Sequence, residues 1–266
     1  MAMAAENKQI EVEEKPKPQV REWEATISRK AWGDFVGCVS TQVDACRLML
    51  DRTGIYVKEV DPAHVAMVET RLFATAFESY RIKGSGEIGI DLDKMKEMLK
   101  VTKKKDAAIH LKLDAPKNRL IMELNGNQRS MGLVDTAGML EPRVPRLTHP
   151  ATVVVNAQEL FTAVKQCGSV SDHAELTATP KVFRVLAEGE DSFKREFSVD
   201  ELAVLVAEEN VTSLFHLDYL TRLTKEATCF HEVALGLGNN SPLSMRGCRA
   251  GVMDALFLLA PKVEYD

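Results

Sequence analysis

The sequence predicts an α+β protein built from two tandem, similar domains, in which helices cover one face of antiparallel sheets. Two observations predict this class. A helical pattern that begins at Leu92-Asp93 returns at Leu217-Asp218, and two further pairs of segments repeat in the same order along the 266 residues. Each copy also shows the same succession of strand, helix, several strands, helix and several strands. Such repetition of a supersecondary unit indicates a duplicated domain.

The first repeated stretch, residues 89–105, is predicted to contain a helix with two contrasting faces, with Asp91 and Asp93 placed to cap its first free N–H groups. Its apolar face is formed by residues at helical spacing, namely Leu92, Met95, Met98 and Leu99. Its other face carries Lys96, Lys100 and Lys103 at i, i+4 and i+7, which predicts a row of ammonium groups. A solvated surface would explain one such helix. The return of the pattern as Leu217-Asp218 to Lys225 favours a shared function.

The other two repeated pairs are a hairpin and a helix. Residues 48–57 parallel residues 176–185, with Ile55 matched to Phe183. Phe35 and Val39 are matched to Phe161 and Val164. The three correspondences keep their order along the chain, so we interpret the chain as a tandem duplication of one domain.

Element by element, the first copy opens with a strand at Trp23 and a helix over 31–43. Further strands are predicted over 48–50, 55–60, 65–72, 77–82, 108–113, 119–124 and 128–134. The second copy opens at Ala151 with a strand and a helix over 157–167. Strands over 193–197 and 203–206 follow, then a helix from Leu217 and strands over 232–237 and 256–265.

Between the copies, residues 135–150 contain three prolines and no periodicity, which predicts an extended connector. The first residues are polar and interrupted by Pro16 and Pro18, which predicts a flexible tail. The predicted organisation is a tail over 1–21, a first domain over 22–135, a connecting loop over 136–150 and a second domain over 151–266.

Composition restricts the class of protein. There is no apolar run of about 18 residues and no apolar core of signal-peptide length at the start, so we expect an intracellular protein without a membrane span. Five scattered cysteines fit reduced thiols in the cytosol. A formal net charge of −5 argues against a protein that coats nucleic acid with its whole surface, although segregated charge remains compatible with DNA binding.

Several motifs together resemble one family. Leu258-Leu259-Ala260-Pro261-Lys262-Val263-Glu264 resembles the C-terminal signature of proliferating cell nuclear antigen, the sliding clamp of archaea and eukaryotes. Residues 61–68, with the sequence Asp-Pro-Ala-His-Val-Ala-Met-Val, resemble the family's Asp-x-x-His-Val segment. Phe77 to Tyr80, the Leu92 helix, the Ser-Val-Ser-Asp motif at 169–172 and the segment 213–220 follow in family order, and the connections look archaeal.

The resemblance implies the DNA-clamp fold and a closed homotrimeric ring, with helices on the inner face of the sheets around encircled duplex DNA. It implies a processivity factor without enzymatic activity, cofactor or metal, which tethers DNA polymerase, the clamp loader, flap endonuclease and DNA ligase through short peptide motifs. We expect it to be cytoplasmic and nucleoid-associated, or nuclear in a eukaryote. Family positions place Lys100, Lys165 and Lys225 toward the DNA, and helical geometry adds Lys30, Lys96, Lys103 and Arg222. An ordinary solvated lysine is the alternative for each.

Two further sites are carried over from the resemblance. The pocket for partner peptides should comprise Val60, His64, Val65, Val144, Pro145, Pro242, Leu258, Leu259, Ala260, Pro261 and Lys262. His64 could instead be a core histidine. Subunits should meet edge to edge between strands that carry Arg129, Met131 and Leu133 on one side and Phe193, Arg195 and Phe197 on the other. Gly247 and Gly251 weaken a strand interior, so a regular hairpin at 245–251 is left open.

Two alternatives stay open. One is a hetero-oligomeric or non-replicative clamp subunit that keeps the fold but does not trimerise alone. The remote one is a metal-dependent enzyme that uses Cys229 and His231 together with His173 or Cys167. The spacing lacks a second Cys-x-x-Cys or His-x₃-His partner, so this signal is poor.

Overall fold

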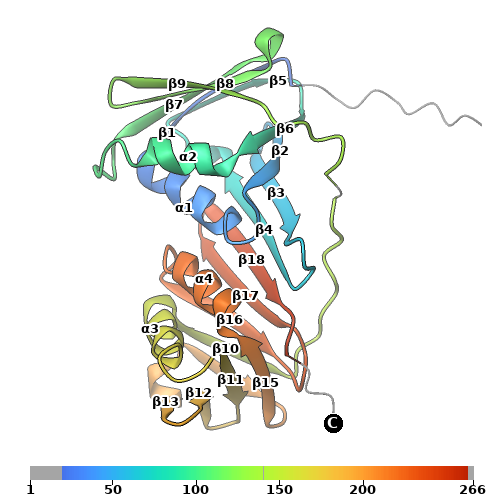
Figure 1. Cartoon of the computed structure of the whole chain (residues 1–266), viewed down its shortest axis with the longest axis vertical. Coiled ribbons are helices and arrows are strands. Elements are labelled where there is room, and N and C mark those ends of the chain that lie inside the picture. Colours follow the sequence, from blue (N-terminus) through green and yellow to red (C-terminus); the bar gives the residue numbers. More distant parts are fainter. Residues whose placement is uncertain (1–19, 140, 263–266) are drawn as a thin grey trace, which may run out of the picture.

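The computed structural model describes residues 20–139 and 141–262, and it has two halves of similar architecture (Figure 1). The predicted tail lies outside the described residues up to position 19, as do residues 263–265 of the last predicted strand and residue 266. The first half contains β1 (Glu22–Ser28), α1 (Arg29–Val39), β2 (Ala45–Asp51), β3 (Gly54–Val60), β4 (Ala66–Phe73), β5 (Ser79–Lys83), β6 (Gly86–Asp91), α2 (Leu92–Leu99), β7 (Ala108–Asp114), β8 (Arg119–Leu124) and β9 (Asn127–Gly132).

The second half repeats this succession of elements. It contains β10 (Ala151–Asn156), α3 (Ala157–Cys167), β11 (His173–Ala178), β12 (Val182–Glu188), β13 (Ser192–Ser198), β14 (Val204–Ala207), β15 (Val211–His216), α4 (Leu217–Ala227), β16 (Glu232–Leu237), β17 (Leu243–Arg249) and β18 (Met253–Leu259). The predicted α+β class with two similar domains is confirmed.

The strands form three antiparallel sheets. One has the order β5-β1-β7-β8-β9 and another the order β13-β12-β11-β15. The third has nine strands, in the order β14-β10-β16-β17-β18-β4-β3-β2-β6, and joins the two halves because β4 pairs with β18. In this pairing Met67 lies opposite Leu258.

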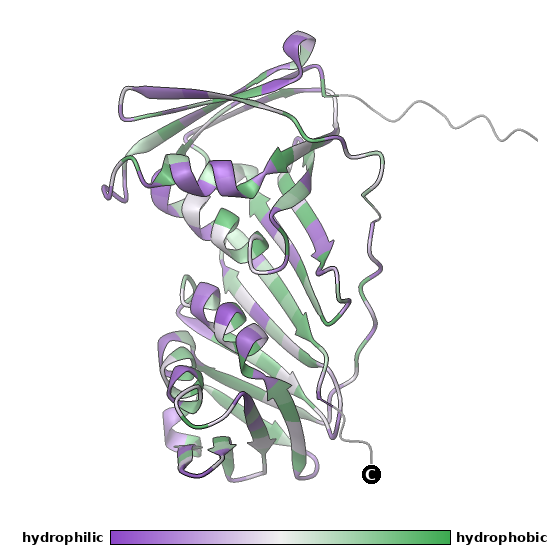
Figure 2. Cartoon of the chain, viewed as in Figure 1, coloured by the Kyte–Doolittle hydropathy of each residue, from purple (hydrophilic) through white to green (hydrophobic). Residues whose placement is uncertain are grey.

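Helices α1 to α4 lie on one side of the sheets, and the described parts of the connector, residues 136–139 and 141–150, run along the opposite side (Figure 1). Each helix buries an apolar stripe, for example Trp32 and Phe35 in α1 and Leu220 and Leu223 in α4. Figure 2 shows hydrophilic residues interrupting the helices, whereas the strands beneath them are largely hydrophobic. The polar helix faces therefore look away from the core, as amphipathic spacing requires.

The hairpin repeat matches in register. Leu50 pairs with Ile55 in the first copy, and Ala178 pairs with Phe183 at the equivalent place in the second. The helix repeat was matched wrongly, by two residues at Phe161 and by three at Val164. Since α1 begins at Arg29 and α3 at Ala157, Phe35 corresponds to Ala163, and Phe161 is only half-buried.

Two observed helices end earlier than predicted, whereas the predicted capping role of Asp91 at the start of α2 agrees with the structure. Residues 86–91 form β6, and α2 begins only at Leu92, where the Asp91 carboxylate accepts a hydrogen bond from Lys94 N at 3.0 Å. It ends at Leu99, before the β-branched pair Val101-Thr102, which disfavours continuation. Helix α1 likewise ends at Val39 and not at residue 43.

The doubtful segment around Gly247 is a regular strand. Strand β17 pairs with both β16 and β18, and a Cβ added at Gly247 would lie 2.2 Å from the Phe230 ring. The glycine thus makes room for a buried aromatic ring. Gly251 has φ +68° in the turn to β18, which is a conformation that glycine adopts without strain.

We therefore expect Gly247→Ala to destabilise the protein by about 1–3 kcal/mol, because the added methyl group overpacks a site filled by Phe230. Chemical denaturation monitored by circular dichroism measures this change. Gly138→Ala is the control, since nothing lies within 4 Å of its added Cβ. Equal stability of the two variants would contradict the packing role.

Candidate nucleic-acid interface and peptide groove

The predicted DNA-facing cations lie on the helices or beside them. Lys30 is on α1, Lys96 is on α2, Lys100 follows α2, Lys165 is on α3, and Arg222 and Lys225 are on α4. We call the side of these four helices that faces away from the sheets the inner face, because the family resemblance predicts that it lines the inside of a ring. Lys100 and Lys225 follow the same repeated Leu-Asp helix start, so the duplication places one cation in each half.

Lys103 does not lie on the α2 helix, as was predicted, but in the loop that follows it. Because α2 ends at Leu99, Lys103 lies in the following loop and not on a helical row with Lys96. That loop is tied to the start of α1, since Lys30 N donates to Lys105 O at 2.8 Å and Arg29 N donates to Ala107 O at 2.7 Å. Its exposed lysines therefore gather near Lys30, and the sequence reasoning overlooked two of them, Lys104 and Lys105.

Neighbouring acids offset part of this charge. Lys30 pairs with Asp34 and Lys96 with Asp93, both with nitrogen to oxygen distances of 2.7 Å. The Lys225 Nζ atom lies 3.5 Å from a Glu226 carboxylate oxygen. Arg222 donates to the backbone carbonyl oxygen of Asp218, and its guanidinium lies over the Tyr219 ring. Within the described chain, no ion pair involves Lys100, Lys103 or Lys165. These three exposed lysines have the charge most available to an anion.

On the opposite side of the sheet, the connector covers a small apolar cluster. Met67, Leu256 and Leu258 from β4 and β18 form its base, and Val60, Val144 and Leu147 pack against them. We call these six residues the groove cluster. Val60, Val144 and Leu258 were among the predicted pocket residues, whereas Met67, Leu256 and Leu147 were not. Alternation along β18 could have shown that Leu256 and Leu258 share one face.

Leu259 does not belong to this groove. It is fully buried in the main core on the other face of β18, together with Phe257. The two leucines of the Leu258-Leu259 pair point to opposite sides because successive strand residues alternate. We therefore correct the assignment of Leu259 from the pocket to the core.

The remaining predicted pocket residues lie in four separate segments of the chain. Ala260 N donates to Val65 O at 2.8 Å, and Lys262 N donates to Leu214 O at 2.7 Å, so the segment after β18 is held on both sides. His64 is exposed with φ +58°, which rules out the core-histidine alternative. Four further predicted residues are exposed or half-buried, namely Val65, Pro145, Pro242 and Pro261.

The turn that carries His64 is organised by Asp61. One carboxylate oxygen accepts hydrogen bonds from Val65 N and Ala66 N, both at 2.7 Å. The other accepts from Ala63 N at 3.1 Å and from the Tyr219 hydroxyl of α4 at 2.9 Å. Partial burial raises the pKa of Asp61, but these hydrogen bonds outweigh it and hold the pKa below its ordinary value. Asp61 thus links the groove to the second half.

We expect Asp61→Asn to cost about 1–3 kcal/mol at neutral pH, because one side of an amide cannot accept from Ala63 N. A carboxyl with a depressed folded-state pKa stabilises the protein above its unfolded pKa and loses this effect as pH falls. The difference between wild type and variant should therefore shrink below about pH 4. Denaturation across pH measures it, and Tyr219→Phe, which removes only the bond between halves, is the partial control. A difference independent of pH would contradict this role.

The two predicted subunit-contact strands are both sheet edges. Strand β9 ends the five-stranded sheet and β13 ends the four-stranded sheet. Met131 and Phe197 are buried in the chain's own core, so they support these strands from behind and present no side chain outward. Leu133 lies beyond β9 and is half-buried, and Arg129 pairs with Glu97 at 2.8 Å.

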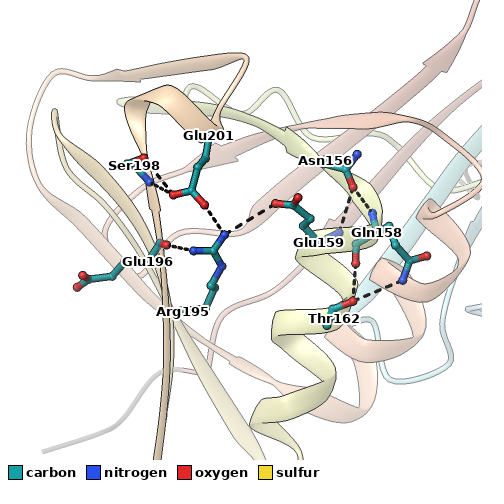
Figure 3. A network of polar contacts seen from close by, with 8 residues as sticks. All are labelled: Asn156, Gln158, Glu159, Thr162, Arg195, Glu196, Ser198 and Glu201. Carbon is teal, nitrogen blue, oxygen red and sulfur yellow. Dashed lines mark hydrogen bonds and ion pairs between the residues drawn. The ribbon is translucent and has the colours of Figure 1, made fainter.

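Arg195 anchors the β13 edge (Figure 3). Its guanidinium pairs with Glu201 at 2.5 Å and lies 3.9 Å from Glu159, whose backbone N–H is capped by Asn156 at the start of α3. A shallow cavity of about 320 Å³ lies between this arginine, Phe193 and the polar side of α3. The structure therefore brings the β13 edge and α3 into one continuous surface.

The residues of the enzymatic alternative do not converge. His231 is exposed beside Glu232, while Cys229 contacts Cys38. His173 stacks on His216 with ring centroids 4.2 Å apart, and Cys167 is buried in α3. Within residues 20–139 and 141–262, no three His, Cys, Asp or Glu side chains come together in a metal-binding arrangement. Nor does any helix among these residues have the length and apolar character to cross a bilayer.

Comparison with known proteins agrees with this architecture. The sequence profile of the proliferating cell nuclear antigen N-terminal domain matches residues 24–136. The DNA polymerase sliding clamp of Methanosarcina mazei is 36% identical over 247 residues, which cover 92% of this chain and all of the relative. That of Methanocella arvoryzae is 35% identical with the same coverage.

Solved structures share the fold. A. fulgidus PCNA, in a structure with the C-terminal region of FEN-1 bound, superposes with a TM-score of 0.84 at 24% identity, covering 92% of this chain and all of that one. PCNA from Thermococcus kodakaraensis gives a TM-score of 0.82 at 23% identity, covering 90% of this chain and all of that one. With full-length relatives above one-third identity, the chain belongs to the proliferating cell nuclear antigen family of DNA polymerase sliding clamps.

Proposed function

We propose that three copies of this chain close into a ring by pairing β9 of one copy with β13 of the next. Both strands end a sheet, and an unpaired edge presents backbone N–H and C=O groups to another strand. They lie at opposite ends of the molecule (Figure 1), so each copy offers two different surfaces, as a head-to-tail ring requires. The tandem domains over 22–135 and 151–266, joined by the loop over 136–150, then give six similar units around the hole.

The inner face of this ring surrounds duplex DNA and attracts its phosphates without reading bases. Lysine contacts to phosphate supply sequence-independent affinity that weakens as salt rises. The cations are few and several are paired with acids, for example Lys30 with Asp34, which suits sliding better than tight grip. Topology retains the ring on DNA. The protein acts as a processivity factor and not as an enzyme, in the compartment that holds the chromosome.

The groove cluster and its surrounding segments receive short peptide motifs from partner proteins. Apolar side chains of such a motif would displace or join Val144 and Leu147 on the base formed by Met67, Leu256 and Leu258. The A. fulgidus relative with the FEN-1 C-terminal region bound supports a flap endonuclease as one partner. DNA polymerase, the clamp loader and DNA ligase are the other proposed partners.

The observation that carries this proposal is the pair of open edges at opposite ends of a duplicated chain. Light scattering of the purified chain should give the mass of three subunits, and the same preparation should stimulate a DNA polymerase on primed circular DNA. A mass of one or two subunits would instead support the hetero-oligomeric alternative. Trimers that give no stimulation would point to a non-replicative clamp.

A further inference from the structure

Two cysteine thiols meet across the boundary between the halves. Cys38 lies in the last turn of α1, Cys229 lies in the turn after α4, and their sulfur atoms are 3.9 Å apart. This is sulfur to sulfur contact between residues that are 191 positions apart in sequence. Neither residue has a place in the DNA-facing surface, the groove or the sheet edges.

The surrounding packing holds the two sulfurs near each other. Helices α1 and α4 approach closely at Gly37, where an added Cβ would lie 2.4 Å from a Glu226 carboxylate oxygen. On the same boundary, Arg249 pairs with Asp34 of α1 at 2.7 Å. The contact is thus part of a packed interface. A disulfide needs a sulfur to sulfur distance of about 2.05 Å, so the two sulfurs must move about 1.9 Å closer. This movement falls to Cys229, because it lies in a turn after the regular hydrogen bonding of α4 has ended.

We propose that Cys38 and Cys229 form a reversible disulfide that clasps the two halves together, with a small-molecule disulfide as the oxidant. The Cys229 thiolate attacks one sulfur of the oxidant, which forms a mixed disulfide and releases one small thiolate. Cys38 then gives its proton to the released small thiolate and attacks the Cys229 sulfur, which expels the second small thiolate. This second thiolate takes up a proton from solvent, which replaces the proton that Cys229 gave to solvent when its thiolate formed. The protein loses two hydrogens, and the oxidant is reduced to two small thiols.

The order of attack follows from burial and charge. Cys229 is half-buried, so it is the sulfur that an oxidant can reach, whereas Cys38 is fully buried. The hydrogen bond with Cys229, burial, and the nearby carboxylates of Glu226 and Asp34 raise the pKa of Cys38 well above its ordinary value. Cys38 therefore keeps its proton until the mixed disulfide lies beside it, and it acts as the resolving thiol.

The other three cysteines provide internal comparisons. Cys46 and Cys167 are free thiols buried in the core, and burial raises the pKa of each. Cys248 is exposed, and its hydrogen bond to Asp254 raises its pKa. It is the competing site for any unselective oxidation.

The test uses the full chain incubated with glutathione disulfide, quenched with iodoacetamide and digested without reduction. Mass spectrometry should find a peptide that joins Cys38 to Cys229, and dithiothreitol should separate it. Cys38→Ser should accumulate a glutathione adduct at Cys229, while Cys248→Ser should leave the cross-link unchanged. Closing so long a loop should also raise the melting temperature of the oxidised protein by about 5–10 °C, and Cys229→Ser should abolish that rise.

Three results would overturn the proposal. One is recovery of Cys38 and Cys229 as alkylated free thiols under conditions that modify Cys248. Another is a glutathione adduct on Cys229 of the wild type that Cys38 does not resolve. The third is a cross-link that involves Cys248. None of these readouts depends on ring formation or DNA, so failure here is separate from failure of the proposed function.

Discussion

Replacing Lys100, Lys165 and Lys225 together by Glu should reduce polymerase stimulation on primed circular DNA by about tenfold or more. These lysines lie on or directly after α2, α3 and α4 on the inner face, and the first two have no ion pair with another described residue. Each lost phosphate contact should also lower the slope of log affinity against log salt concentration by about 0.9. Losing three phosphate contacts should therefore lower both the affinity for DNA and the dependence of that affinity on salt concentration.

The matched control reverses three exposed lysines that lie outside helices α1 to α4, namely Lys83, Lys117 and Lys181, which gives the same net charge. This control should retain stimulation, and light scattering should show that both variants keep the wild-type mass. If the inner-face variant stimulates the polymerase as well as the control does, the assignment of these lysines to DNA is wrong.

Replacing Leu256 and Leu258 by Ala should abolish measurable binding of a synthetic peptide that carries the C-terminal clamp-binding region of a flap endonuclease. Both side chains form the base of the groove cluster under Val144 and Leu147. Burying a leucine contributes about 1.5–3 kcal/mol, so losing two should weaken binding by about a hundredfold or more. Isothermal calorimetry measures the affinity, and circular dichroism reports whether the variant is folded.

Two controls separate the groove from the core. Val204→Ala with Val206→Ala removes exposed apolar side chains from the distant strand β14, and it should leave the affinity unchanged. Leu259→Ala should lower stability by about 2–5 kcal/mol because it creates a cavity in the main core. Undiminished peptide affinity in the folded Leu256→Ala, Leu258→Ala variant would refute the groove as the docking site.

Local pattern predicted the elements whose apolar spacing is regular. Helix α3 was predicted over its observed bounds, and the start of α4 at Leu217 was also predicted. The end of α2 was misplaced because the lysines at 100 and 103 continue the helical spacing after the hydrogen bonding has stopped. The end of α1 was misplaced because Val43 continues the apolar spacing of Val36 and Val39 beyond the helix. Strand β17 was left open because the glycine rule describes an average strand, whereas Gly247 here accommodates Phe230.

By itself the sequence determined that this protein is a duplicated α+β chain with cations on matching helices, because periodicity and repetition are local properties. Only the tertiary structure decided which residues meet across long separations. It joined β4 to β18, tied the lysine loop to α1, brought Val144 and Leu147 of the connector onto Leu258, and placed Cys38 against Cys229. Such contacts depend on how whole elements pack, and a single sequence carries no local signal for that packing.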